Sequence, residues 1–154
     1  NAGLEASVIR RVSARWQLSA SAGVLRTRFL DYATVDRNLA GREQAHAPAR
    51  QAALSAEYRH ERGWFARADL QHVAAFYFSD SHDERSGSYN LLNLRAGYET
   101  SSWRADMWVR NALDDDYAQR GFFFGNEPPD FPDRLYVQQA DPRTAGLTVN
   151  WTLH

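Results

Sequence analysis

The stretch GWFARADLQHVAAFYFS, residues 63–79, alternates between two kinds of side chain along its whole length. From Trp64 onward every second residue is apolar except His72, while the charged Arg67 and Asp69 both fall on the other parity. Successive side chains of a β-strand point to opposite faces, so this pattern predicts a strand with one apolar face and one charged face.

The same alternation recurs along the chain, in LLNLRAGYE (91–99), WRADMWVRNAL (103–113) and LTVNWTL (147–153). It predicts an all-β chain with about seven antiparallel strands. We expect these strands at 3–12, 15–30, 49–59, 63–79, 89–99, 102–113 and 142–153.

The predicted connections alternate in length. Tight turns fall at SAR (13–15), HER (60–62) and TSS (100–102), whereas 31–48, 80–88 and 114–141 are long, polar loops. Short turns on one side and long loops on the other are typical of outer-membrane β-barrels. We therefore interpret the chain as an up-and-down transmembrane β-barrel segment.

Aromatic residues fall at the expected strand ends. Six of them share the rim of tight turns in an up-and-down sheet: Trp16, Trp64, Trp103, Trp151, Tyr58 and Tyr98. The opposite rim is expected to carry Phe29, Tyr32, Phe76, Phe78 and Tyr89. Aromatic belts at both interfaces are a property of membrane proteins, and a tilted strand from Trp64 to Phe76 spans roughly 30 Å.

Composition narrows the function classes. The 154 residues carry a formal net charge of −1, which provides no basic field for nucleic acid, and they include no cysteine for disulfides or thiolate chemistry. No apolar run approaches the roughly 18 residues of a transmembrane helix. A soluble sandwich or lipocalin-like barrel is the alternative, but the many alanines of the apolar face would make a thin core.

The charged face suits a water-filled lumen. Its candidate lumen-facing residues are Arg67, Asp69, Arg95, Glu99, Arg104, Asp106 and Arg110. Opposite charges on neighbouring strands favour cross-strand ladders, and contacts with a domain inside the barrel are the alternative.

The last third of the chain resembles the end of the barrel in TonB-dependent outer-membrane receptors. The likeness rests on LLNLRAGYE (91–99), WRADMWVRNALDDDY (103–117), DPRTAGLTVNW (141–151) and, more loosely, GWFARADLQHVAAFYF (63–78). Two features depart from the family pattern. Asn111-Ala112-Leu113 stands where the family has adjacent Asn-Leu, and Leu153-His154 stands where it commonly has a terminal aromatic residue.

The resemblance implies a 22-stranded barrel of the outer membrane of a Gram-negative bacterium, closed by an N-terminal plug domain. Residues 1–154 would be its carboxy-terminal part, a fragment or one part of a split chain, with the plug and the earlier strands outside this sequence. The implied function is binding and import of a scarce ligand such as a ferric siderophore. The implied partners are the missing strands and plug, TonB through the plug, membrane lipid and an iron complex, with no cofactor and no nucleic acid.

Two other functions stay open at this stage. One is a small independent outer-membrane barrel with an eighth strand inside 114–141 and a surface-binding or structural role. The other is a soluble β-sheet binding module. No hydrolase elbow, phosphate loop or HExxH motif is present, so we do not expect an enzyme.

The loop at 114–141 contains GFFFGNEPPDFPDRLY, which either packs on itself or faces a ligand. Its candidate ligand contacts are Phe122, Phe123, Phe124, Asn126, Phe131 and Tyr136. The acidic runs at 79–86 and 114–116 lack the spacing of a calcium loop, so we expect no metal site.

Overall fold

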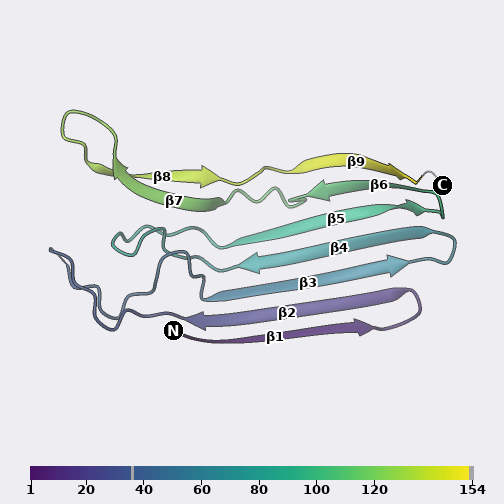
Figure 1. The fold of residues 1–154 in the computed structure, drawn as a ribbon, viewed down its shortest axis with the longest axis horizontal. Coiled ribbons are helices and arrows are strands. Elements are labelled where there is room, and N and C mark those ends of the chain that lie inside the picture. The colour runs from purple at the N-terminus through teal and green to yellow at the C-terminus, as the bar shows by residue number, and fades with distance from the viewer. Residues whose placement is uncertain (36, 153–154) are drawn as a thin grey trace.

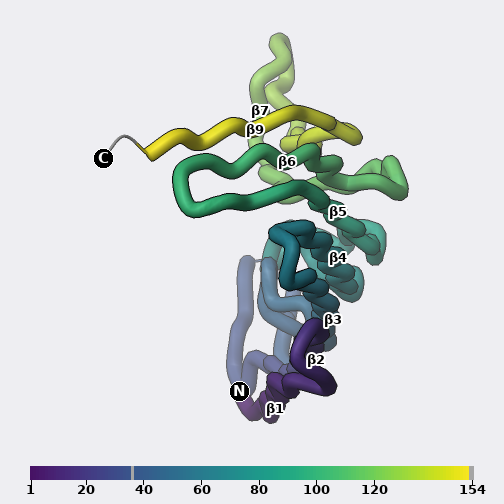
Figure 2. The backbone as a smooth tube through the Cα atoms, turned by 90° about the vertical axis from the view of Figure 1, so that its right-hand side faces the viewer, coloured from purple at the N-terminus to yellow at the C-terminus, as the bar shows by residue number. Residues whose placement is uncertain are grey.

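The computed structural model describes residues 1–35 and 37–152, in which all regular structure is β-strand. Seven strands form one antiparallel sheet, and the chain-order neighbours are hydrogen-bonded throughout except where β6 pairs with β9. Figure 1 shows these strands side by side, and Figure 2 shows that they follow an open arc rather than a closed barrel. The sheet strands are β1 (Ala2–Arg11), β2 (Trp16–Arg26), β3 (Arg50–Arg59), β4 (Trp64–Val73), β5 (Tyr89–Glu99), β6 (Trp103–Arg110) and β9 (Thr144–Trp151).

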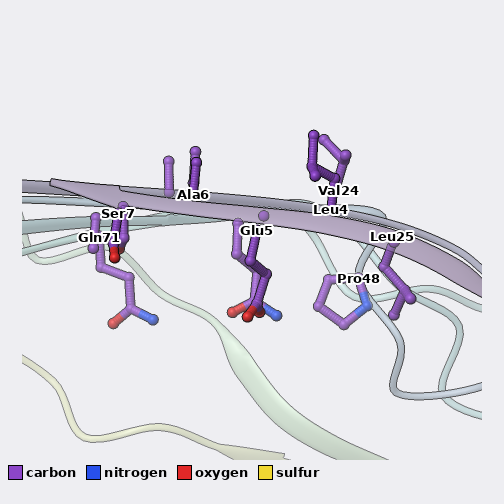
Figure 3. Close-up of a pocket in the computed structure, with 15 residues that line it drawn as sticks. Leu4, Glu5, Ala6, Ser7, Val24, Leu25, Pro48 and Gln71 are labelled. Atoms are coloured by element: carbon purple, nitrogen blue, oxygen red, sulfur yellow. The ribbon is translucent and has the colours of Figure 1, made fainter.

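The pairing register keeps most apolar side chains on one face and most charged side chains on the other across all seven strands. Leu70, for example, lies opposite Leu54 on one side and Leu92 on the other, whereas Arg67 lies opposite Glu57 and Arg95. We call these the apolar face and the charged face. Figure 3 shows the two faces at β1 and its neighbours, where Leu4, Ala6 and Val24 project from one side of the sheet and Glu5, Ser7 and Gln71 from the other.

The apolar face is exposed. Met107 is 66% exposed, Leu147 73% and Val149 66%. A soluble sandwich would bury this face beneath a second sheet. The structure therefore has the two-faced sheet expected of a barrel wall.

The short connections lie at one end of the sheet and the long ones at the other, as predicted (Figure 1). We call these ends the short-turn rim and the loop rim. The short turns are 12–15, 60–63 and 100–102, and Gly63 adopts a φ of 91° in the second. That φ lies in a region that glycine enters without steric penalty.

Three strands end at least three residues earlier than predicted. β2 ends at Arg26 instead of residue 30, β4 at Val73 instead of residue 79 and β6 at Arg110 instead of residue 113. Beyond Val73 the alternation continues in the sequence, but Phe76 and Phe78 are buried at 7% and 6% exposure. They pack within the loops, so packing among loops overrides the strand pattern there.

The predicted second aromatic belt is consequently wrong for Phe76, Phe78 and Tyr89. Phe76 and Phe78 are buried rather than lipid-accessible. Tyr89 lies opposite Val73, which places it on the charged face, where its ring stacks on Tyr117 at 4.1 Å between centroids.

Residues 114–141 contain two further strands, β7 (Ala118–Gly125) and β8 (Asp133–Gln139). They pair with each other in a separate two-stranded sheet, and the hairpin extends beyond the ends of β6 and β9 (Figure 1). The prediction that 114–141 is a loop without strands is therefore wrong, and so is the alternative of an eighth barrel strand within it. The last predicted strand extends to residue 153, and the departure from the family pattern concerns residues 153 and 154. Both residues lie outside those that the structure describes.

Candidate functional site

An aromatic cluster occupies the short-turn rim on the apolar face. Trp16 packs against Tyr58 with ring centroids 5.0 Å apart, and Trp64 against Tyr98 at 4.9 Å. Tyr98 also contacts Trp103, which lies opposite Trp151 in the sheet. The six aromatic residues that the sequence assigned to one rim are therefore together at one level.

The charged face carries a buried carboxylate. The side chain of Asp106 has no exposed surface, and Arg95 donates to it through Nε at 2.6 Å and Nη2 at 2.9 Å. Arg104 Nε donates a further hydrogen bond at 3.2 Å. Gly97, directly opposite Asp106, leaves room for this arrangement, because a Cβ there would lie 2.3 Å from the carbonyl oxygen of Ala105.

A second group of ion pairs joins the first across β3, β4 and β5. Arg67 donates to Asp69 at 2.7 Å and lies 3.3 Å from Glu57. Arg59 then bridges Glu57 at 2.5 Å and Glu99 at 3.4 Å. The Arg67–Glu57 and Arg59–Glu99 pairs cross between strands, as the predicted ladder requires, while Arg67–Asp69 and Arg59–Glu57 lie along single strands.

One arginine of the network packs on an aromatic ring, and another predicted arginine lies outside the network. Phe65 is buried, with the guanidinium of Arg104 4.1 Å from its ring centroid. Arg110 lies over the Trp108 ring at 5.0 Å and forms no ion pair with a described carboxylate. All seven predicted charged-face residues thus share one face, and six of them join one network.

The other half of the charged face is hollow. A depression of about 790 Å³ lies over β1 to β3 and reaches Pro48 and Gln71. Figure 3 shows Glu5, Ser7 and Gln71 projecting to this side. Small side chains leave the space, namely those of Gly3, Ser7, Ser21, Gly23 and Ala53.

The β7–β8 hairpin separates the predicted loop residues onto two faces. Phe123 points inward and stacks on the His82 ring at 3.8 Å between centroids, with an interplanar angle of 6°. Gly121 allows close packing on this side, because a Cβ there would lie 2.5 Å from Cγ of Phe78. This face therefore fastens the hairpin to the loop that follows β4.

The opposite face of the hairpin is open. Phe122 is 50% exposed and Phe124 45%, and Phe124 stacks on Tyr136 with centroids 4.4 Å apart. Phe131, near the tip, is also exposed, and so is Asn126. We call Phe122, Phe124 and Tyr136 the aromatic face of the hairpin.

An ion-pair cluster that the sequence did not suggest joins two loops at the loop rim. Asp83 accepts from Arg42 Nη1 at 2.5 Å and from Arg37 Nη2 at 3.0 Å. These hydrogen bonds, first from Arg42 and then from Arg37, hold the pKa of the Asp83 carboxyl below its ordinary value. Arg42 and Arg85 also lie over the Tyr77 ring, at 4.2 and 4.3 Å. Partners some 40 residues apart leave no local pattern in the sequence.

Within residues 1–35 and 37–152, no three histidine or acidic side chains gather where they could hold a metal ion. The same residues include no helix long and apolar enough to span a membrane.

An antiparallel sheet with one exposed apolar face, one charged face and an aromatic short-turn rim defines a segment of a barrel wall. Residues 1–112 match the family model described as TonB dependent receptor-like, beta-barrel. The chain belongs to this family.

Two solved structures have the same fold over nearly all of the chain. The siderophore receptor PiuA from Acinetobacter baumannii aligns with a TM-score of 0.78 at 17% identity over 97% of this chain. The ferric yersiniabactin uptake receptor FyuA from Yersinia pestis aligns with a TM-score of 0.78 at 20% identity over 96%. The chain spans only 21% and 22% of those receptors, and at such identities the likeness concerns the fold.

Proposed function

We propose that residues 1–154 form the carboxy-terminal part of the barrel of a TonB-dependent receptor. The whole receptor would bind a scarce ligand such as a ferric siderophore and import it across the outer membrane of a Gram-negative bacterium. The observation that carries this proposal is the family match over residues 1–112, on a sheet whose apolar face is exposed. The two similar receptors, which are named for siderophores, support the ligand class.

The two faces of the sheet indicate how the barrel would be oriented in the membrane. The exposed leucines, valines and alanines would face hydrocarbon, where an outward apolar band is required, and the ion network would face the lumen. The aromatic short-turn rim would lie at the periplasmic interface, since tryptophan and tyrosine favour headgroup depth. The loop rim would then be extracellular.

The barrel needs further strands and a plug. β1 and β9 are the edges of the sheet, and an unpaired edge is not tolerated in hydrocarbon because its backbone groups have no hydrogen-bond partners. Earlier strands of the same receptor would pair with these edges. A plug domain would fill the lumen and make the contact with TonB.

The aromatic face of the hairpin is the best placed ligand contact within this chain. Phe122 and Phe124 remain half exposed although neighbouring loop residues are packed. Planar rings of a siderophore could stack on them, and pairs of aromatic rings contribute about 0.5–1.5 kcal/mol beyond area burial. Phe123 would instead hold the hairpin in position.

The experiment uses the full-length receptor and a strain that lacks it, grown under iron limitation with a panel of ferric siderophores. At least one complex should restore growth only when the receptor is present. Replacing both Phe122 and Phe124 by Ala should weaken binding of that complex about tenfold. The matched control is Leu30→Ala, which removes an apolar side chain that is 95% exposed in another loop.

Two results would contradict this proposal at different levels. Absence of the receptor from the outer membrane, or growth independent of it with every iron complex, would overturn the transport function. Unchanged affinity in the double variant would overturn only the assignment of the ligand contact.

A further inference from the structure

A groove of about 530 Å³ crosses the apolar face of β1 to β5 near the short-turn rim. The sheet register explains it, because Ala56 and Ala68 lie side by side between longer side chains. The larger side chains that border the groove are Val8, Leu18, Leu54, Leu70 and Leu92.

Arg10 stands at the β1 end of this groove, directly opposite Leu18. It is the one charged side chain on the apolar face in the half of the described sheet nearer the short-turn rim. The Trp16–Tyr58 pair lies one step closer to that rim. An arginine at this depth is costly in hydrocarbon unless its long side chain reaches a polar group at the interface.

We propose that the groove binds an acyl chain of an anionic phospholipid of the periplasmic leaflet, with the Arg10 guanidinium on the headgroup phosphate. This inference rests on the proposed membrane orientation. A guanidinium matches a phosphate through two parallel hydrogen bonds, and the apolar groove beside it matches the chain attached to that phosphate.

The distribution of charge favours a lipid over a second copy of the receptor. Every acidic residue of the seven described sheet strands lies on the charged face, so another copy of this surface offers no carboxylate to Arg10. A phospholipid supplies the missing negative charge.

The test titrates the purified full-length receptor with phosphatidylglycerol and with phosphatidylcholine of identical acyl chains, and counts bound lipids by native mass spectrometry. The wild type should bind phosphatidylglycerol more tightly. Arg10→Gln should weaken that binding about fivefold, as expected for one arginine near an anionic headgroup, and leave phosphatidylcholine unchanged. Ala56→Phe should fill the groove and weaken binding of both lipids.

Ala105→Phe is the matched control, since Ala105 lies on the apolar face of β6 outside the groove. Heat-modifiable gel migration shows whether each variant is folded, and Ala68→Leu replaces Ala56→Phe if the latter does not assemble. Unchanged phosphatidylglycerol binding in folded Arg10→Gln and groove-filled receptors would overturn the lipid site. A receptor dimer that the groove-filling variant abolishes would overturn it in favour of a second copy. Ligand uptake, measured on the same variants, tests the transport function separately.

Discussion

Replacement of Asp106 by Asn should destabilise the receptor more than any other single loss of charge in the ion network. The carboxylate is fully buried and receives three hydrogen bonds, two from Arg95 and one from Arg104. Asparagine keeps the shape of the side chain and retains one acceptor oxygen. Its amide group, however, places a donor against a guanidinium donor.

The expected cost follows from the exposure of the partners. Loss of a hydrogen bond between charged groups costs about 1.5–3 kcal/mol, and breaking a fully buried ion pair costs about 3–5 kcal/mol. Arg95 and Arg104 are 41% and 28% exposed, so water can solvate the donors that are released. Arg104 also keeps its contact with Glu99. We therefore expect about 2 kcal/mol, roughly a thirtyfold change in the folding equilibrium.

The assay is denaturant unfolding of the full-length receptor in detergent, followed by tryptophan fluorescence and compared at constant m-value. The control is Glu61→Gln, which removes the same charge from an ion pair in which Glu61 is 78% exposed and Arg15 46%. That change should cost much less than Asp106→Asn, because solvent screens an exposed ion pair. The reasoning fails if Asp106→Asn is as stable as the wild type, or if the two variants lose equal stability.

Three further predictions concern the sheet, the loops and the isolated chain. Gly97→Ala should destabilise the barrel by about 3 kcal/mol, the upper part of the overpacking range, because the added Cβ would lie 2.3 Å from the Ala105 carbonyl oxygen. The control is Gly87→Ala, which has open space around it and should leave the level of assembled receptor unchanged. The ion pair between Asp83 and Arg42 should fully protect the backbone amides of residues 79–83 from hydrogen exchange above about pH 5. The reason is that the pKa of the Asp83 carboxyl is lower in the folded state than the unfolded value of about 3.9. Protection should fall as the pH drops through that lowered pKa, and a profile that is the same in Asp83→Asn would contradict this. Residues 1–154 alone should not insert into liposomes as a stable monomer, because both edges of the sheet are unpaired; a protease-resistant monomer would refute this.

The sequence was sufficient to predict the sheet because a period of two assigns every strand residue to a face. Arg67, Arg95 and Asp106 could be placed on one surface from parity alone, and the register confirms that placement. The ends of the strands were harder to predict from the sequence, because the alternation continues through Phe76 and Phe78 although both residues lie outside the sheet. Their burial depends on contacts with distant loops, which the local pattern does not contain.

The hairpin and the loop cluster show the same limit. β7 contains three consecutive phenylalanines, so it lacks the alternation that identified the other strands. Only pairing with β8 distinguishes inward Phe123 from outward Phe122 and Phe124. The ion pair of Arg42 and Asp83 likewise arises from the approach of two loops.

The ion network also bears on how a plug would contact this wall. Its four arginines and four carboxylates neutralise one another within the sheet: Arg59, Arg67, Arg95 and Arg104 against Glu57, Asp69, Glu99 and Asp106. A plug therefore has no need to supply countercharges there. Within the described strands β4 to β6, Arg110, which stacks on Trp108 without an ion pair to a described carboxylate, is the charge on this face that remains for a partner. The network therefore links β3 to β6 into one electrically balanced surface, and the hollow over β1 to β3 lies beside it.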